Sequence, residues 1–313
     1  MSLTLVEAMK LAAANGETKR AGVIATYART SAWLANIPMR DIPGNAYAYN
    51  REGTLPGIAF RGLNETYTAS TGVINPLSES LRIAGGYLDV DRAQVKMFGD
   101  GVRSTHEQLK VKALAATITS KLAKGDSTSD PRESDGLQVR LTGAQLISNG
   151  STNGGDALSL LKLDETIDAV SGPNKQIWCS KAMIRRLTAA ARTTSVSGYI
   201  TYAQDAFGRQ LTQYNGIPLV PAYPDNDGTE PLPFTEVGAG GATATATSLY
   251  VVSLADGYVS GVQNGMMDVI DQGLLDSEPK YRTLVEWLVS PIVIEHPRAA
   301  ARLYGVSDAP VVA

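Results

Sequence analysis

A single long amphipathic segment, residues 101–125, constrains this chain more than any other feature. Apolar side chains recur along it at the spacing of one buried helical stripe, whereas its lysines fall off that stripe. The stripe consists of Val111, Leu114, Ala115, Ile118 and Leu122. Ser104 and Glu107 have capping-box spacing at the start of the helix, and Gly125 is placed for a left-handed C-terminal cap. The pattern predicts a helix of about 30 Å that is a structural spine rather than an active-site helix.

The composition of the chain excludes several classes of protein. Its 313 residues suffice for one large domain or two ordinary ones, and its formal net charge of -3 predicts neither strong nucleic-acid binding nor a membrane-surface role. Cys179 is the single cysteine, which excludes an intrachain disulfide and fits folding in a reducing cytoplasm. Residues 1–20 lack the features of a signal peptide, and no apolar run is long enough to cross a bilayer. We therefore expect no membrane partner.

Residues 37–73 combine short alternating runs with many prolines and glycines. The runs at Ala46 to Tyr49 and at Ile58 to Phe60 predict strands, and the punctuation between them predicts an open hairpin. A segment with so little apolar mass cannot form its own core, and a two-stranded excursion is only marginally stable alone. We expect this hairpin to lie on another subunit.

The rest of the chain predicts an α+β protein. Helices are expected over 2–15, 23–34, 158–170 and 181–192. Strands are expected within 75–99 and over 177–179, 248–254 and 284–294. Ser180 is the expected N-cap of the last helix, and Asn215-Gly216 predicts a two-residue hairpin turn. Pro218, Pro221 and Pro291 favour positions at sheet edges. The first two helices carry little core of their own and need a partner surface.

Candidate catalytic and metal-binding residues are scarce. His106, His296 and Cys179 share no ligand spacing, so no zinc site is predicted and each is expected to be structural or on the surface. Asp225 to Gly228 lacks the flanking ligands of a calcium loop and is interpreted as a turn. Gly238 to Gly241 lacks the lysine and the strand–loop–helix context of a phosphate loop, and is interpreted as a flexible loop.

The charged residues indicate no site either. Asp89 and Asp91 can share one face of a strand and are interpreted as solvated carboxylates. The basic residues are scattered without interleaved aromatic residues, so no nucleic-acid groove is predicted. We therefore assign no catalytic residue, cofactor-binding residue or metal ligand, and we do not expect an enzyme.

The order and character of these segments resemble the major capsid proteins of tailed bacteriophages, which have the Hong Kong 97-like capsid fold. The resemblance is carried by Asn75 to Met97, His106 to Asp126, Asp156 to Val170 and Lys175 to Arg192. It extends over nearly the whole chain. It rests on element order and segment character, because the family has no short invariant fingerprint.

The resemblance implies a division of the chain into four parts. Residues 1–36 would form an N-terminal arm, and 37–73 an extended E-loop that lies over a neighbouring subunit. Residues 74–135 and 284–313 would form a peripheral P-domain that includes the spine helix at 105–124. Residues 136–283 would form an axial A-domain around the symmetry axes.

The sequence also departs from some members of the family. No long scaffolding segment precedes the arm, so a separate scaffolding protein is expected. Residues 37–73 contain Arg40, Arg51 and Arg61 but no lysine, so a lysine–asparagine cross-link from this loop is not expected. No inserted immunoglobulin-type domain is evident.

The resemblance implies a major capsid protein that assembles into the pentamers and hexamers of an icosahedral shell and packages double-stranded DNA. It would fold in the bacterial host cytoplasm and end in the virion capsid, without catalysis or cofactor. Expected partners are other copies, a separate scaffolding protein, a portal, a decoration protein as a further candidate, and nonspecifically contacted DNA.

Two other functions stay open at this stage. An encapsulin-like nanocompartment shell has the same fold and encloses protein cargo, but the polar arm with Glu17, Lys19 and Arg20 does not suggest an apolar cargo groove. A soluble α+β enzyme needs a convergent polar site, and the near absence of histidine and cysteine argues against one.

Overall fold

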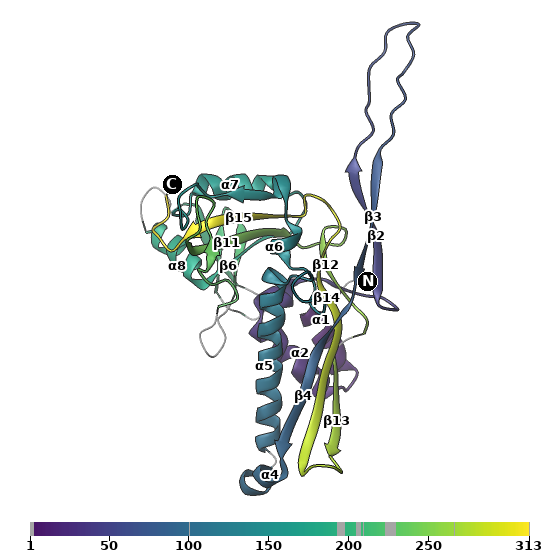
Figure 1. The fold of residues 1–313 in the computed structure, drawn as a ribbon, viewed down its shortest axis with the longest axis vertical. Helices are drawn as coiled ribbons and strands as arrows, with labels where there is room; N and C mark the ends of the chain where they lie inside the picture. Colours follow the sequence, from purple (N-terminus) through teal and green to yellow (C-terminus); the bar gives the residue numbers. More distant parts are fainter. Residues whose placement is uncertain are drawn as a thin grey trace.

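The computed structural model describes residues 3–99, 101–192, 198–204, 208, 210–222, 230–265 and 267–312. Figure 1 shows an elongated molecule with three parts: a domain built on a large sheet, a longer region built along helix α5, and a thin hairpin that projects beyond both. The two larger parts correspond to two hydrophobic cores, which share the large sheet between them.

Helix α5 (Gly101–Lys124) confirms the predicted spine and has 24 residues, or about 36 Å at the usual rise per residue. Its buried stripe is the predicted one, with Leu114 half-buried against the core. The predicted capping box is wrong, because the helix starts at Gly101 and already includes Ser104. The extra turn holds Arg103, which forms ion pairs with Glu107 and Asp271. A tertiary contact therefore extends the helix beyond its local start signal.

Gly125 ends α5 in a different way from the one predicted. It is not among the glycines with positive φ, so the predicted left-handed cap is wrong. A Cβ atom at this position would clash with the backbone oxygens of Ser134 and Lys121. The glycine is required because the chain leaving the helix packs directly on the returning loop, where Gly136 donates a backbone hydrogen bond to Gly125 at 2.8 Å.

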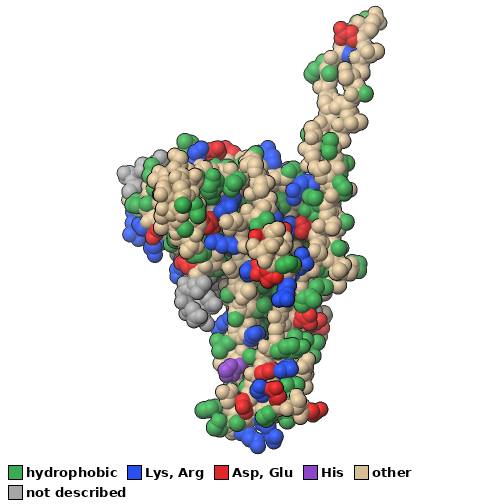
Figure 2. Space-filling view, viewed as in Figure 1, with side chains coloured by type: hydrophobic (Ala, Val, Ile, Leu, Met, Phe, Trp, Pro, Cys, Tyr) green, Lys and Arg blue, Asp and Glu red, His purple; other side chains and the backbone are tan. Residues whose placement is uncertain are grey.

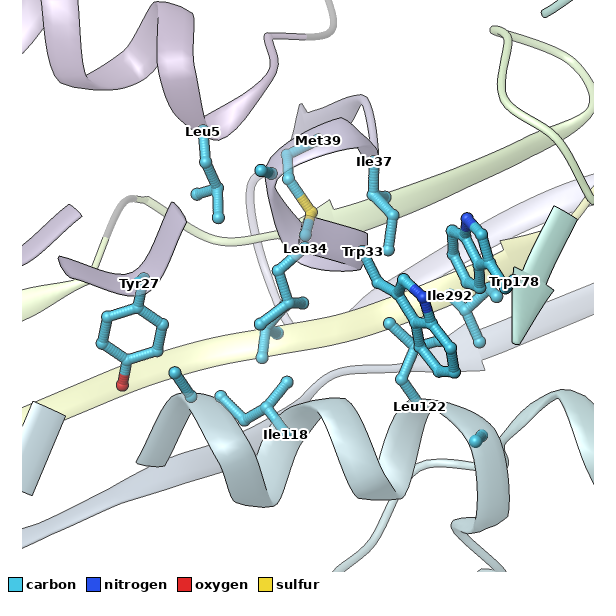
Figure 3. Close-up of a cluster of buried hydrophobic side chains, with 14 of the residues drawn as sticks. Leu5, Tyr27, Trp33, Leu34, Ile37, Met39, Ile118, Leu122, Trp178 and Ile292 are labelled. Atoms are coloured by element: carbon cyan, nitrogen blue, oxygen red, sulfur yellow. The ribbon is translucent and has the colours of Figure 1, made fainter. Parts of the chain in front are cut away.

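Three N-terminal helices pack within their own chain. They are α1 (Leu5–Ala14), α2 (Thr18–Thr30) and α3 (Ala32–Asn36). Helix α2 lies on the spine helix, and α1 lies on α2 and α3. Thr4 and Glu7 form the capping box of α1. Figure 3 shows how α3 inserts Trp33 and Leu34 between α5 and the sheets, and Trp33 stacks on Trp178 with 4.9 Å between ring centroids. The partner surface that these helices need therefore comes from the same subunit.

A five-stranded sheet lies beside α5 and α2. It contains β1 (Met39–Asp41), β4 (Arg82–Asp91), β12 (Val259–Gln263), β13 (Asp268–Leu274) and β14 (Lys280–Ile294). Strand β14 is central, because it pairs with β4, β12 and β13. Along its first half, every second side chain is buried, from Thr283 to Val289. These side chains form one wall of the first core, and the short helix α4 (Arg92–Phe98) connects β4 to α5.

An eight-stranded mixed sheet forms the second part of the molecule. Along its order it contains β5 (Leu146–Ser148), β15 (Ala300–Ser307), β11 (Ala244–Ser253), β6 (Lys175–Ser180), β9 (Ile217–Ala222), β8 (Gln210–Tyr214) and β7 (Ile200–Gln204), with β10 (Glu236–Val237) beside β11. Helices α7 (Leu160–Ala169) and α8 (Lys181–Ala190) pack on one face of this sheet. The opposite face contacts the first core through Trp178 and Tyr250. The short helix α6 (Leu137–Arg140) and the 3-10 turn η1 (Gly143–Gln145) follow the spine.

Several local predictions in this sheet are confirmed. Ser180 caps α8 by accepting a hydrogen bond from the Met183 amide at 3.4 Å. Asn215 and Gly216 both have positive φ in the turn between β8 and β9, as a two-residue hairpin of this kind requires. The expected strand at 177–179 is fully buried.

The proline positions contradict the prediction of edge strands. Pro218 and Pro221 lie in β9, an interior strand between β6 and β8. The strand tolerates Pro221 because the pairing of β8 with β9 covers only Ile217 and Pro218. Pro291 lies inside β14, the most central strand of its sheet, and the edge prediction is wrong for it. The strand tolerates this proline because the register between β12 and β14 shifts at the same place.

The predicted hairpin is present, but its bounds differ from those expected. It consists of β2 (Ala46–Thr54) and β3 (Val73–Ser80), which form a two-stranded sheet of their own. Residues 55–72, the hairpin tip, contain no regular secondary structure, so the strand predicted at Ile58 to Phe60 is absent. The expected partner subunit is not needed to form the two strands, because the base of the hairpin is held by its own chain.

Candidate assembly surfaces

Arginines and tyrosines fix the base of the hairpin to the end of β14. Tyr47 donates a hydrogen bond to the Glu295 carboxylate at 3.0 Å, and Arg40 lies 3.4 Å from the same carboxylate. Arg40 also donates to the Tyr47 hydroxyl and pairs with Asp256. Arg51 donates to the backbone oxygen of Ile294. Charge-assisted hydrogen bonds of this kind are stronger than neutral ones, so they fix the direction in which the hairpin projects from its subunit.

A small apolar cluster and a second ion pair complete this anchor. Tyr49 packs with Leu81, Val262 and Val293. Glu79 of β3 accepts two hydrogen bonds from Arg140, one of them at 2.9 Å. Both side chains of this pair are largely buried, at 19% and 12% exposure, so solvent screens the pair weakly. The pair joins the hairpin to helix α6, which follows the spine helix.

The anchor residues were not singled out from the sequence. The signal that could have indicated them is the alternation Ala46-Tyr47-Ala48-Tyr49, which places two tyrosines on one face of a strand. The partners of Arg51 and Tyr47 lie 243 and 248 residues away from them in the chain. No local pattern links residues at such distances.

The hairpin tip is the most exposed apolar surface of the described chain. Its large apolar residues and their exposed fractions are Leu55 (77%), Ile58 (93%), Phe60 (104%), Leu63 (95%) and Tyr67 (67%). Figure 2 shows the tip standing clear of the rest of the molecule. Its hydrogen bonds are local, such as that from the Gly62 amide to Glu65 at 2.7 Å. An apolar surface of this size on a projecting segment is typical of an interaction site.

A second apolar surface lies on the outer face of the five-stranded sheet. Tyr87 of β4 and Ile270 of β13 both pair with Leu284 of β14, so the three side chains form one row across the sheet. Ile83, on the same face of β4, is 69% exposed. The inner face of this sheet packs on the first core, whereas the outer row stays largely exposed: Tyr87 is 57% and Ile270 51% exposed, and the Arg282 guanidinium lies over the Tyr87 ring, 4.9 Å from its centroid.

The two strand aspartates of this sheet are exposed, as interpreted from the sequence, and each also has a structural partner. Asp89 forms a paired contact with Arg282 at 2.6 and 2.7 Å, and this guanidinium lowers the pKa of the Asp89 carboxyl. Asp91 caps helix α4 by accepting a hydrogen bond from the Ala93 amide at 2.7 Å. Neither carboxylate is merely solvated, because each holds one element in place.

A cleft of about 370 Å³ lies between α2, α5, β13 and β14. Val23, Val111 and Val285 contribute to an apolar part of its wall. Its charged residues, Arg103, Glu107 and Asp271, are bound to one another or to Thr283, as described for the start of the spine. The cleft therefore offers apolar surface and a neutralised charge cluster rather than a free acid or base.

The residues considered for chemistry have structural environments. The ring of His296 packs on Tyr258 with 5.3 Å between centroids, and its Nδ1 accepts a hydrogen bond from the Arg298 amide at 3.1 Å. His106 is half-buried in the second turn of α5. Cys179 is fully buried, and burial raises the pKa of its thiol to about 12, far from nucleophilic. Asp225 to Gly228 lies outside the described residues.

Gly238 to Gly241 is a packed junction, so the prediction of a flexible loop is wrong. A Cβ atom at Gly238 or Gly240 would clash with the backbone of the loop at 151–155, and one at Gly241 would clash with the Asn153 side chain of the same loop. Thr243 donates its amide to the Asn153 side chain at 3.0 Å and closes the junction. The glycines are needed here for close approach rather than for motion.

Neither a metal-binding cluster nor a membrane-spanning helix is found in the described part of the chain. No group of three histidine, cysteine, aspartate or glutamate side chains there is placed to hold a metal ion. Among the described residues, no helix is long and apolar enough to cross a membrane.

Comparison with known proteins identifies the fold. No family model and no curated protein matches this sequence. Among solved structures, the holo-SrpI encapsulin complex from Synechococcus elongatus PCC 7942 matches over 88% of each chain, at 16% identity and a TM-score of 0.60. A structure from Mycobacterium phage Adephagia matches at 11% identity and a TM-score of 0.61, over 89% of this chain and 90% of that one. The capsid of a native GTA particle matches at 11% identity and a TM-score of 0.60, over 90% of each.

The chain has the Hong Kong 97-like capsid fold. This finding confirms the resemblance and the α+β class inferred from the sequence. The division into N-terminal arm, E-loop, P-domain and A-domain stays a prediction. Within the predicted bounds, the first core draws on the arm, the P-domain and the A-domain, and most of the second core falls in the A-domain.

Proposed function

We propose that this chain is a shell subunit, a major capsid protein that assembles into the pentamers and hexamers of an icosahedral head around double-stranded DNA. One observation carries the proposal: the hairpin has a base fixed by its own subunit and an apolar tip that no described part of that subunit covers. Such a tip is costly to leave in water and gains stability when a neighbouring copy covers it.

The proposed assembly is directional. Each subunit donates one tip and receives one, and the receiving surface we propose is the apolar row of Tyr87, Leu284 and Ile270 on a neighbour's outer sheet face. A contact between two different surfaces forms a ring when its rotation closes, rather than a two-fold pair. The fixed base reduces the ordering cost of each contact, because only the tip has to adapt. Several modest contacts per subunit then reinforce one another in a closed shell.

The proposal extends to partners and place. Scaffolding would come from a separate protein, a portal would occupy one vertex, and a decoration protein is a further candidate partner. Contact with packaged DNA would be nonspecific, and assembly would take place in the cytoplasm of a bacterial host. The proposal gives the chain no catalytic role and no cofactor.

An encapsulin-like shell is the second candidate. It is favoured by the likeness to the encapsulin complex, which has the highest identity of the structures compared above. The two candidates share the tip contact and differ in their cargo. Nucleic acid retained by nuclease-treated shells would favour the capsid, whereas a co-purifying protein in fixed ratio would favour the nanocompartment.

The test is removal of the hairpin tip. A deletion of Asn45 to Asn64 is not suitable for this test, because it also removes Tyr49 and Arg51 and so destroys the anchor. Replacing residues 56–71 by a short Gly-Ser turn keeps both strands and all anchor contacts. Wild-type protein, expressed alone and with its neighbouring genes, is expected to form closed shells or rings of five and six in electron micrographs. The variant is expected to fold and to form neither.

Two outcomes would contradict the proposal. A wild-type chain that stays monomeric under every condition, including with a candidate scaffold, would overturn the shell function. Shells of unchanged stability from the tip variant would overturn the assignment of the tip as the contact.

A further inference from the structure

Strand β7 has an open edge at one end of the eight-stranded sheet. It pairs with β8 on one side and with no described strand on the other. Strand β8 in turn pairs with β9 only at Gln213 and Tyr214, next to the two-residue turn. Most of the β7–β8 ribbon is therefore not hydrogen-bonded to the rest of the sheet. Tyr202 in the middle of β7 is 54% exposed, and Tyr199 just before it is 57% exposed.

The backbone of β7 directs every second residue toward this open edge. The Asn215 amide donates a hydrogen bond to the Tyr199 oxygen at 2.8 Å, so the backbone groups of Tyr199 face β8. Because these groups alternate in direction along an antiparallel strand, those of Ile200, Tyr202 and Gln204 point away from β8. No backbone hydrogen bond joins these three residues to another element in the described part of the chain. The edge therefore presents a regular row of amides and carbonyls that a further strand can bind.

Strand β7 lacks the features that protect the edge of a sheet. Proteins prevent unwanted pairing at an edge strand with charged side chains, prolines or bulges. Each other edge strand of five or more described residues has at least one of these: charged residues in β4, two aspartates and a bulge in β13, and charged residues in both hairpin strands. The sequence of β7, Ile-Thr-Tyr-Ala-Gln, has neither charge nor proline, and its pairing with β8 has no bulge. The chain therefore leaves this one edge open to pairing.

We propose that β7 pairs with β7 of a second copy, antiparallel and across a two-fold axis at Tyr202. In this register Tyr202 lies opposite the same residue of the second copy, and Ile200 lies opposite Gln204. Each residue that points outward then meets a residue that points outward, so the edge is complementary to itself. The contact adds one strand to another and makes a single sheet of the two subunits' sheets.

A second copy fits this edge better than a different protein does. The strand carries no charge, so it neither selects an oppositely charged partner nor repels an identical one. At the centre of the pair two exposed tyrosines lie side by side, and facing aromatic residues stabilise paired strands. The proposed tip contact joins two different surfaces and accounts for a ring, whereas a contact between identical surfaces can join one ring to the next. The pairing thus goes beyond the proposed function and does not depend on it.

Cysteine cross-linking tests the contact. A pair of five-residue strands is too small to hold two isolated subunits together for long, so the contact has to be trapped. The single native cysteine, Cys179, is fully buried, which leaves an introduced cysteine as the accessible thiol. With diamide as the oxidant, Tyr202→Cys is expected to give at least tenfold more disulfide-linked dimer than Thr201→Cys, the matched control. Thr201 is also exposed, but its two copies would lie about 8 Å apart, too far for a disulfide.

A mixture of two variants tests the register. Thr201 lies opposite Ala203 of the second copy, so Thr201→Cys mixed with Ala203→Cys is expected to give mixed disulfides that neither variant gives alone. In that mixture, Tyr202→Pro removes an outward amide and no bond to β8, whereas Tyr202→Ala removes only the side chain. The proline is expected to lower the cross-linked fraction at least fivefold more than the alanine. Circular dichroism melts check that each variant folds.

The remaining outcomes are distinguishable. Equal cross-linking by Tyr202→Cys and Thr201→Cys would mean random collision and would overturn the contact. Cross-linking at residue 202 without mixed disulfides, or equal effects of proline and alanine, would overturn the strand pairing. No cross-linking, in unassembled protein or in shells, would exclude the contact, and shells seen in electron micrographs would then leave the shell function intact. In-register cross-linking of a chain that never forms shells would support the pairing and overturn the shell function.

Discussion

Phe60→Ala is expected to separate the stability of the subunit from the stability of the shell. Phe60 is 104% exposed within its own subunit, so its removal should change the free energy of unfolding by less than about 0.5 kcal/mol. Burying a phenylalanine against a neighbour contributes about 2–3 kcal/mol. That loss corresponds to a roughly 30- to 160-fold higher protein concentration at the onset of assembly.

Two measurements on the same protein examine this expectation. Light scattering against protein concentration gives the onset of assembly, and urea denaturation of the unassembled subunit gives the free energy of unfolding. Phe98→Ala is the matched control, because it removes the same side chain from α4, where Phe98 is 72% exposed at the opposite end of the molecule.

The reasoning is refuted in two ways. If Phe60→Ala assembles at the wild-type concentration, the tip is not buried in the shell. If it lowers the free energy of unfolding by more than about 1 kcal/mol, the tip contacts its own subunit, contrary to the exposed position described above.

Four further predictions concern the interior of the subunit. Trp33→Ala should lower the free energy of unfolding in urea by about 3–5 kcal/mol, because it removes the stack on Trp178. Trp33→Phe should lower it by less, because it chiefly removes the 3.0 Å hydrogen bond to the Val220 oxygen. Equal losses for the two variants would contradict this. Glu236→Gln should lower the free energy of unfolding in the same assay by about 3 kcal/mol, since it leaves Lys124 and Arg302 without their shared counter-charge. An unchanged urea midpoint would show that Glu236 does not stabilise the subunit through these two ion pairs. The Cys179 thiol, with its pKa raised to about 12, should resist iodoacetamide at pH 8.5 until the protein is unfolded, and fast labelling of native protein would be the contrary result. Stability should fall as the pH rises above about 8.5, because the unfolded thiol ionises there while the folded thiol keeps its proton.

The elements that local pattern determines were predicted well. The buried stripe of α5, the N-cap at Ser180 and the turn at Asn215-Gly216 each depend on residues within about one turn of one another. The fold class followed from the order of such elements. These features can be inferred from one sequence because the physical cause lies in neighbouring residues.

The features that were missed depend on distant residues. Gly125 and Gly238 resemble a cap and a flexible loop locally, but another part of the backbone approaches each of them. Arg103 lengthens α5 through Asp271, which is 168 residues away. The same distinction between local and distant residues holds for the candidate assembly surfaces. The hairpin was visible as a segment without a core, whereas its apolar tip and the anchor of Arg40, Tyr47 and Glu295 required the fold.

The position of β14 and β15 in the chain has a consequence for the order of synthesis and folding. Strand β14 is the centre of one sheet and β15 is hydrogen-bonded to β5 and β11 in the other, yet both strands lie after residue 279. A nascent chain lacking them exposes the apolar faces of α5 and of β11 to water. Neither core can close until the ribosome has made the last strands, so folding follows translation instead of accompanying it. A chain interrupted before β14 would aggregate rather than yield a soluble half.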